Sequence, residues 1–550
     1  MTQQTSEQTP WTNAANWWFA LAVLGVTMIV YLPALQGLPL LDDDYCVFRN
    51  PVIRAANGLW RIWFTRELDD FWPLSYTFFW VQVHAFGASA LGYHLVNILL
   101  HVATTLLIWQ ILRLLGSRWA YMAALLYCVH PVNVEAVAWM FQQKTTMAAA
   151  LAFGSVLMFI KYQRSDQQRR WYVWSLVLFL LSLLTKTVAI AWPGVILGLC
   201  WWHEGRITKA AIRRVLPFIA IALVIGIVNL MWYAGKPPEL ADIPREDGLL
   251  SRIAVAGAMV FFYAGKVLWP AQLLFVYPRW SLPFTGIVDF LPVIAVIVIA
   301  VVLLRYARTW ARPWLAAYGY YLFALFPVLG FFAVSYMRFS LVADHWQYLA
   351  LIGVVAIVTE ALGRLLERVD KYAPILLLTA CVCMLGAMTY SRARLFSDPL
   401  PLWRATLAGN PSSAMVNGGI ADELSLRGQD EEAFGYYLKA IALHPTAQAY
   451  ARMAFIMHRA GRFAEALTYH KQEIALKPND AQAYTTYGID LFQTGRYAEA
   501  TQALTKAIAL DSTLPDPHKN LAAVLAAQRD TATALLHIHI ADSLRALRSQ

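Results

Sequence analysis

Apolar runs of near membrane-spanning length recur along the first 390 residues of the chain. The clearest cover residues 17–35, 94–112, 119–130, 145–161, 172–184, 187–202, 215–233, 286–304, 314–332, 347–362 and 374–390. A helix needs about 20 apolar residues to cross a bilayer, and a large bundle can shelter shorter or tilted helices. The pattern therefore predicts an all-α, polytopic membrane bundle of about 11 transmembrane helices.

Basic residues divide the loops between these runs into two sets. Lysine and arginine gather in alternate short loops, which is typical of the cytoplasmic side of a membrane. We therefore expect a cytoplasmic N-terminus, with 36–93, 131–143, 234–285, 333–346 and everything after 390 on the outer side. The apolar segment 251–269 would reverse the later loops if it crossed, so we expect an interfacial or re-entrant helix there.

Beyond about residue 400 the chain carries a repeat. Three glycines and three alanines recur at a spacing of 33 or 34 residues: Gly428, Gly461, Gly495, Ala433, Ala466 and Ala500. This period, with small residues where two helices cross, is the tetratricopeptide pattern. We predict two domains, a membrane domain over 1–395 and a tetratricopeptide-repeat α-solenoid over 396–550, with a degenerate fourth repeat at 515–541. Solenoids of this kind present a concave surface that commonly binds peptide or protein.

Composition agrees with a membrane protein. Hydrophobic residues make up 59% of the 550 residues and charged residues only 14%, below the roughly 25% that is usual in soluble domains. The net charge of +10 lies mostly in short loops, so topology explains it and we expect no nucleic-acid partner. The five cysteines show neither a disulfide framework nor a zinc spacing. The first apolar run lacks a basic leader, so we do not expect a cleavable signal.

Three consecutive aspartates, Asp42, Asp43 and Asp44, follow the first span in "LPLLDDDYCVFRNPVIR". A carboxylate at the membrane surface can deprotonate an acceptor hydroxyl. Asp43 and Asp44 could instead hold a divalent cation, Mg²⁺ or Mn²⁺, beside a phosphate. The plainer alternative is a solvated acidic cap at a helix end.

Ionisable residues also occur in the later outer loops. They are His130, Glu135 and Lys144 in "HPVNVEAVAWMFQQK", Lys186 in "LSLLTKTVAIAWPG", and Arg338, Asp344, His345 and Tyr348 in "SYMRFSLVADHWQYLALIG". Such residues at membrane depth are candidates for function. The structural alternatives are a His130–Glu135 hydrogen bond, an Arg338–Asp344 pair, and lysines that extend to the interface. We interpret Arg279 as a weaker phosphate-binding candidate, and Asp69 and Asp70 as solvated loop acids.

These phrases occur in an order that resembles a known group. The phrases that carry this resemblance, in order and ahead of the repeats, are "LDDDYCVFRNPVI", "GYHLVNILLHVATTLL", "HPVNVEAVAWMFQQK", "LLTKTVAIAWPGVILGLCWWHEGR" and "VADHWQYLALIG". The chain looks like a bacterial relative of the transmembrane-and-tetratricopeptide (TMTC-like) protein O-mannosyltransferases. That group lies within the GT-C superfamily of membrane glycosyltransferases. The resemblance spans roughly residues 35 to 512 and rests on motif order together with the repeats, not on any single phrase.

The resemblance implies an enzyme that takes a sugar from a polyprenyl-phosphate or polyprenyl-diphosphate carrier at the outer membrane face. It implies catalysis by Asp43 or Asp44, with Asp42 and Glu135 beside them. It also implies that basic residues of other loops, Lys186 among them, hold the donor phosphate and that His130, Asp344, His345 and Tyr348 belong to the substrate site. From their own chemistry we assign Lys144, Arg338 and, more weakly, Arg279 to the donor phosphate as well. The chain departs from the group at Gln142 and Gln143, where an acid and an arginine are frequent, and at Trp346, where tyrosine or phenylalanine is frequent.

The expected reaction is inverting transfer of the sugar to a protein hydroxyl, with the acceptor, or a partner that carries it, captured by the repeats. A surface glycan or a lipid is the alternative acceptor. A lipid-linked-glycan flippase and a non-catalytic repeat scaffold are alternatives of other classes, and the clustered carboxylates favour the enzyme over both. The motifs suggest a bacterial inner (plasma) membrane, with the repeat domain in the periplasm.

Overall fold

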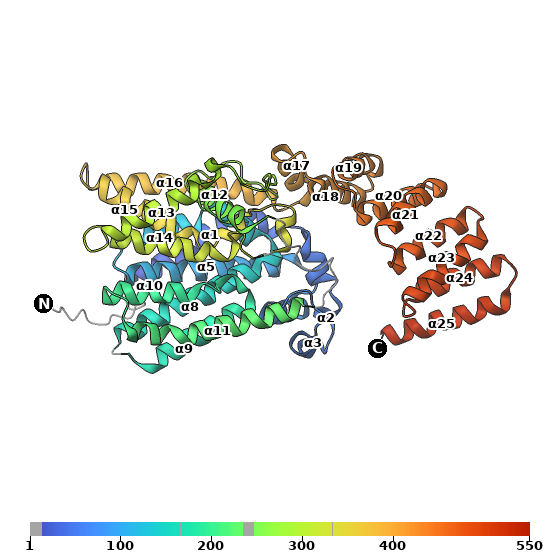
Figure 1. The fold of residues 1–550 in the computed structure, drawn as a ribbon, viewed down its shortest axis with the longest axis horizontal. Helices are drawn as coiled ribbons and strands as arrows, with labels where there is room; N and C mark the ends of the chain where they lie inside the picture. The colour runs from blue at the N-terminus through green and yellow to red at the C-terminus, as the bar shows by residue number, and fades with distance from the viewer. Residues whose placement is uncertain (1–13, 166, 235–246, 333, 550) are drawn as a thin grey trace. The chain divides into compact units, whose positions relative to one another are not determined.

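The computed structural model describes residues 14–165, 167–234, 247–332 and 334–549. All regular elements in these ranges are helical, which confirms the predicted all-α class (Figure 1). The chain divides into two compact units, Met1–Leu402 and Trp403–Gln550. The sequence had suggested a boundary between residues 395 and 396.

The first unit contains sixteen α-helices in the described residues, joined in part by short helical turns. They are α1 (Ala14–Val30), α2 (Pro51–Arg54), α3 (Gly58–Phe64), α4 (Pro73–Phe86), α5 (Ala90–Leu114), α6 (Ala120–Cys128), α7 (Val134–Ala138), α8 (Gln143–Arg164), α9 (Arg169–Thr185), α10 (Trp192–Glu204), α11 (Lys209–Tyr233), α12 (Leu249–Leu268), α13 (Leu291–Arg305), α14 (Arg312–Leu325), α15 (Leu351–Leu366) and α16 (Ala373–Leu395). Helix α8 packs against both α5 and α9.

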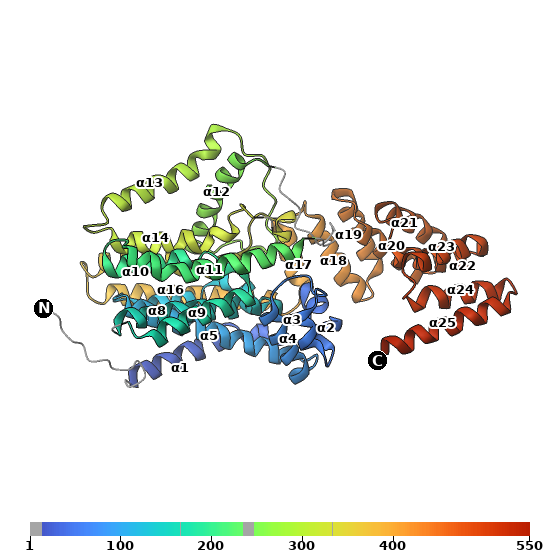
Figure 2. The ribbon, with the colours of Figure 1, turned by 60° about the horizontal axis from the view of Figure 1, so that its bottom comes forward.

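Six helices of the described residues are long and apolar enough to cross a membrane, or seven if the bent pair at Ala120–Cys128 and Pro131–Ala138 is one span. Several other expected spans are shorter; α1, for example, has 17 residues. The number of eleven spans therefore stays a prediction. Helix α12 has 20 residues and meets the length and composition of a span, although the sequence suggested an interfacial or re-entrant segment. Figure 2 shows α12 leading to α13 at the edge of the bundle, and no residue of α13 is buried.

The second unit consists of helices that pair in chain order after α17 (Pro399–Gly409), which crosses the boundary between the units. The pairs are α18 (Ala414–Leu426) with α19 (Asp430–Leu443), α20 (Ala447–Arg459) with α21 (Phe463–Leu476), α22 (Ala481–Gln493) with α23 (Tyr497–Leu510), and α24 (Pro515–Ala527) with α25 (Thr531–Ser549). Gly428, Gly461 and Gly495 have φ of 74°, 72° and 75° between the two helices of their pairs. Only glycine adopts this left-handed turn without strain, which explains the spacing of these residues.

The fourth pair departs from this rule. Arg529, 34 residues after Gly495, has φ of 69° at the corresponding turn. A residue with a Cβ is strained there. The degenerate fourth repeat thus keeps the backbone conformation of the others but lacks the residue that favours it.

A buried polar cluster joins three repeat helices. His470 on α21 lies 2.8 Å from Glu473 through Nδ1 and 3.2 Å from Asp490 of α22 through Nε2. His458 of α20 also contacts Asp490, with 2.5 Å between Nδ1 and Oδ1. Burial alone would lower the pKa of His470, but its hydrogen bonds to Asp490 and Glu473 raise the pKa above the usual value. The protonated imidazole therefore stabilises this part of the solenoid.

Candidate active site

The three consecutive aspartates occupy three different environments. Asp43 begins the turn η2 (Asp43–Phe48) and is buried. Its Oδ2 accepts the N–H of Leu40 at 2.8 Å and its Oδ1 accepts the N–H of Phe141 at 2.7 Å. Burial raises the pKa of Asp43 to about 8, although these two bonds oppose the rise. Asp43 therefore joins the segment after α1 to the segment between α7 and α8.

Asp44 points away from that contact and pairs with Arg49 at 2.9 Å on the surface. Asp42 is half-buried, and its charge acts on three groups from other loops: Lys144, Lys186 and His345. The charge of Asp43 also acts on Lys144, but among the three carboxylates Asp42 is the one whose charge acts on all three of these groups.

Two lysines come together beside this carboxylate. Lys144, in the first turn of α8, is buried with its Nζ 3.3 Å from the ring centre of Phe141 and 4.5 Å from that of Trp72. Lys186 follows α9, and burial together with the positive charge of Lys144 lowers its pKa. Neither lysine has a carboxylate within ion-pair distance in the described part of the chain.

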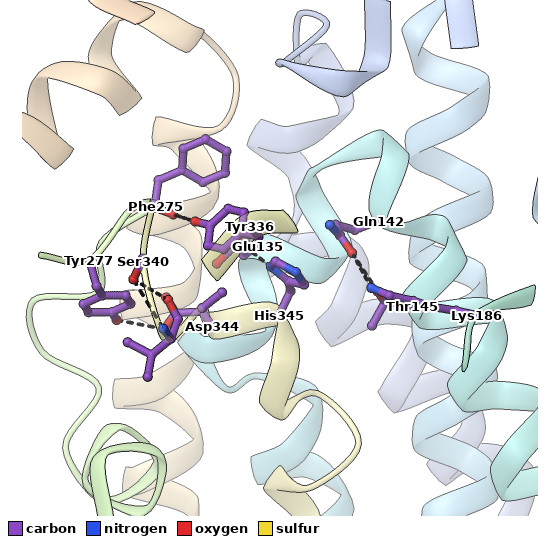
Figure 3. A network of polar contacts seen from close by, with 12 residues as sticks. Glu135, Gln142, Thr145, Lys186, Phe275, Tyr277, Tyr336, Ser340, Asp344 and His345 are labelled. Atoms are coloured by element: carbon purple, nitrogen blue, oxygen red, sulfur yellow. Dashed lines mark hydrogen bonds and ion pairs between the residues drawn. The ribbon is translucent and has the colours of Figure 1, made fainter. Parts of the chain in front are cut away.

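Neutral groups hold Lys186. Its Nζ donates to Oγ1 of Thr145 at 2.8 Å and lies 3.4 Å from Oε1 of Gln142 (Figure 3). Gln142 also accepts a hydrogen bond from Thr145 at 2.6 Å. Gln142, one of the three positions where the sequence departs from the group it resembles, thus contacts the lysine without contributing a charge. An anion that binds beside Lys186 would favour the charged form of the lysine.

Glu135 of α7 and His345 form a second buried pair. Nδ1 of His345, in the turn η9 (Asp344–Gln347), lies 2.6 Å from Oε1 of Glu135, and Figure 3 shows this contact between the lysine and Asp344. Burial lowers the pKa of His345 well below its usual value. The two side chains therefore share one proton between Nδ1 of His345 and Oε1 of Glu135. The alternative His130–Glu135 bond does not form, since His130 contacts the carbonyl of Val267 and Glu135 contacts His345.

Asp344 ties two parts of the bundle together. It accepts from Tyr277 Oη at 2.8 Å and from Arg392 of α16 at 3.0 Å, and Arg392 also donates to the carbonyl of Leu273. Burial raises the pKa of Asp344 to about 7 and the positive charge of Arg392 opposes the rise. Arg392, which the sequence did not single out, is therefore the partner of Asp344; the alternative Arg338–Asp344 pair does not form.

Two further candidates, His130 and Tyr348, form hydrogen bonds inside the bundle. His130 lies 3.0 Å from the carbonyl of Val267 through Nε2 and accepts the N–H of Val132 through Nδ1. Tyr348 lies 2.7 Å from Nδ1 of His101 through its hydroxyl. These bonds satisfy both side chains within the bundle.

The two candidate arginines lie elsewhere. Arg338 is exposed, with its guanidinium 4.6 Å from the ring centre of Phe339, and Arg279 is exposed as well. Neither belongs to the labelled network of Figure 3. Their donor-binding role stays a prediction without a structural contact to support it.

The residues present do not form a metal site around Asp43 and Asp44. Both oxygens of Asp43 already accept backbone N–H groups, and Asp44 pairs with Arg49. Among the described residues, no group of three or more histidine, cysteine, aspartate or glutamate side chains could hold a metal ion. We therefore write no chemical step through a metal, and the divalent cation stays a prediction.

Comparisons with known proteins agree with the motif order. Residues 73–232 match the family described as dolichyl-phosphate-mannose-protein mannosyltransferase, and residues 488–528 match a TPR repeat family. A protein O-mannosyl-transferase of Caenorhabditis elegans is 21% identical over 78% of this chain and 63% of its own length. TMTC4 of Mus musculus, also a protein O-mannosyl-transferase, is 22% identical over 76% of this chain and 66% of its own.

A Drosophila melanogaster protein O-mannosyl-transferase is 31% identical over a shorter part, 32% of this chain and 22% of the relative. The chain thus spans less than two thirds of the length of these relatives. The resemblance that the motifs indicated is confirmed.

Proposed function

We propose that this chain, which resembles the TMTC-like protein O-mannosyltransferases of the GT-C superfamily, is an integral-membrane glycosyltransferase. It would move a sugar from a polyprenyl-phosphate-type donor to a protein hydroxyl at the outer face of the membrane. One observation carries the proposal. Lys144 and Lys186 lie together beside Asp42, and their other contacts are aromatic rings or neutral oxygens.

This arrangement suits a phosphate leaving group. Two cations, one buried and one half-buried, without an acid partner within ion-pair distance can receive a phosphate, because partial exclusion from water strengthens their attraction for an anion. They would hold the donor so that its anomeric carbon faces the acceptor. As the bond from that carbon to the phosphate oxygen breaks, the lysines stabilise the charge that develops on the phosphate.

Asp42 would act as the general base. It removes the proton of the acceptor hydroxyl while the hydroxyl oxygen forms its bond to the anomeric carbon. Attack on the side opposite the phosphate inverts the anomeric centre. A phosphate is a good leaving group and needs little help from a general acid, so one carboxylate suffices where a glycoside hydrolase uses two. The Glu135–His345 pair would bind a hydroxyl of the substrate through Nε2 of the imidazole.

The remaining parts follow from the same proposal. The repeat domain would hold the acceptor protein or peptide, or a partner that carries it, on its concave face. The site lies where residues 36–93, 131–143 and 334–346 meet; we propose that these face the outer side, so that the donor would reach the site from the outer leaflet. In a bacterium this places the chain in the inner membrane and its repeats in the periplasm.

The test uses the purified full chain in lipid nanodiscs with polyprenyl-phosphate-linked sugars and a membrane protein extract as acceptor. Mass spectrometry follows donor consumption and the mass gained by the acceptor. Wild type would transfer, Asp42→Asn and Lys186→Met would not, and Lys371→Met, which removes an exposed lysine, would behave as wild type. Addition of a chelator tests the divalent cation separately.

Three outcomes are distinct. Transfer to a glycan or a lipid in place of protein would change the acceptor class and leave the donor site standing. Movement of the carrier across the membrane without its consumption would favour a flippase. Equal inactivity of wild type and both variants, with acceptor binding retained by the repeats, would favour a scaffold.

A further inference from the structure

The segment between α3 and α4 is fixed to the last turn of α11. Nε1 of Trp232 donates to the carbonyl of Leu68 at 3.3 Å, and its ring lies 5.2 Å from that of Phe71. The hydroxyl of the next residue, Tyr233, donates to Oδ1 of Asp70. Two consecutive residues of α11 thus hold three positions of residues 68–71. Asp70 is a positioned, half-buried carboxylate, not the solvated loop acid that the sequence suggested.

This segment leads directly to the lysines. Trp72, two residues after Asp70, lies against Lys144 with 4.5 Å from Nζ to the ring centre. The charge of Asp70 acts on both lysines; on Lys186 it is a stronger influence than that of Asp42, and on Lys144 a weaker one. Asp70 therefore lies near enough to both cations of the candidate donor site to act on them.

A carboxylate in this place has an evident electrostatic effect. Two cations close together in a buried site repel each other, and an anion nearby offsets that cost while the site is empty. When a phosphate enters, it and the carboxylate attract the same two cations and repel each other. The carboxylate thus weakens phosphate binding and does so more strongly as the phosphate charge grows.

We propose that Asp70, positioned by Tyr233, is the resident counterion of the Lys144–Lys186 pair and competes with the carrier phosphate for it. The inference rests on the proposed function. A sugar-bearing polyprenyl phosphate is a diester with one negative charge, whereas the spent carrier is a monoester with a charge of about −1.5 to −2 at pH 7. The competition by Asp70 would therefore act most strongly on the spent carrier and promote its release.

The first experiment measures binding alone and needs no transfer. Farnesyl phosphate is titrated into the purified full chain in detergent, and calorimetry gives its dissociation constant. We expect Asp70→Asn to bind about tenfold more tightly, the size expected when one partly screened unit charge is removed near a phosphate. Asp70→Glu would bind as wild type does. A merely structural role would weaken binding or leave it unchanged, not strengthen it.

The matched control is Asp69→Asn. It removes the same charge from the adjacent residue, which is half-buried as well but acts less strongly than Asp70 on Lys144 and Lys186. It should change the dissociation constant by a clearly smaller factor than Asp70→Asn. Tyr233→Phe would shift the constant in the same direction as Asp70→Asn by a smaller factor.

The second experiment measures turnover. With a lipid-linked donor, Asp70→Asn should lower both KM and kcat, and added farnesyl phosphate should inhibit it more strongly than it inhibits wild type. Unchanged or weaker binding of farnesyl phosphate by Asp70→Asn, when wild-type binding requires Lys186, would overturn the counterion role alone. Binding that is the same in wild type and in Lys186→Met would instead refute the phosphate site, and with it the proposed function.

Discussion

The environments of Asp42 and Asp43 predict that replacing each by asparagine will damage the protein in different ways. Asp43 accepts backbone N–H groups from Leu40 and Phe141 through separate oxygens. An asparagine can satisfy only one of these donors, since its amide nitrogen would face the other. The substitution removes a hydrogen bond to a charged group and leaves a buried N–H without an acceptor. These two penalties are not fully additive, so we expect a loss of about 3 kcal/mol in the free energy of unfolding.

Asp42 should show the opposite pattern. It is half-buried and accepts no backbone hydrogen bond in the described ranges, so asparagine there should change the free energy of unfolding by no more than about 0.5 kcal/mol. As the proposed general base, its loss should slow transfer by about 10²- to 10⁴-fold. The rate and the stability thus separate the two residues.

Both quantities can be measured on the same samples. Thermal unfolding of the full chain in detergent is followed with a dye that becomes fluorescent on reaction with thiols, since Cys128 and Cys200 are buried and react only after unfolding. The comparison is made at pH 9, because burial raises the pKa of Asp43 to about 8 and the carboxylate is ionised above that value. A stable but inactive Asp43→Asn, or an Asp42→Asn that unfolds as early as Asp43→Asn, would refute this division of roles.

Four further predictions follow from individual contacts. Lys186→Met should raise the KM for a lipid-linked donor about 10- to 100-fold in steady-state assays, because it removes a charge-assisted contact worth roughly 1.5–3 kcal/mol, without lowering the unfolding temperature. Asp344→Asn should cost about 3 kcal/mol or more in thermal unfolding, because it leaves Arg392 buried beside a neutral partner. Arg529→Gly should stabilise the repeat domain by about 0.5–1 kcal/mol, seen as slower amide exchange in α24 and α25. Amide protection in α21 and α22 should fall as the pH rises from 6 to 8, since the raised pKa of His470 contributes stability that is complete below about pH 6.5 and lost through its folded-state pKa.

Each of these has a control in the same chain. Lys371→Met and Gly495→Ala serve the first and third, and the alanine should destabilise because Gly495 has φ of 75°. Asp370→Asn, in an exposed turn, serves the second. His470→Gln should flatten the pH dependence of exchange after correction for the intrinsic rate. The respective argument would be contradicted by an unchanged KM in Lys186→Met, an unchanged unfolding temperature in Asp344→Asn, or a less protected α25 in Arg529→Gly. A pH profile of exchange that His470→Gln leaves intact would contradict the fourth.

The parts that the sequence predicted are those governed by short-range rules. The spacing of Gly428, Gly461 and Gly495 indicated the repeats because each turn requires a positive φ that glycine supplies. The order of the outer-loop motifs indicated the candidate site because residues on one side of a bundle can meet. Both follow from position along the chain alone.

The parts that the sequence did not predict depend on which way a side chain points. Asp42, Asp43 and Asp44 are identical in type and adjacent, so only the local backbone conformation decides their different contacts. Asp43 bonds to the backbone of two segments, Asp44 pairs with Arg49 at the surface, and Asp42 lies beside the lysines. Arg392 is 48 residues from Asp344, and no local pattern links the two. Asp70 was taken as solvated because its partner, Tyr233, ends a helix more than 160 residues later.

The end of α16 has a consequence for how the protein is made. Arg392 bonds to Asp344 next to His345, and the carbonyl of Ser397 accepts the N–H of Leu38 at 3.2 Å, shortly before the three aspartates. Helix α16 and the residue that follows it by two thus contact both the segment after α1 and the segment before α15. During synthesis the ribosome must deliver about 400 residues before these contacts can form, so the nascent membrane domain stays without a closed site until its final helix has been inserted.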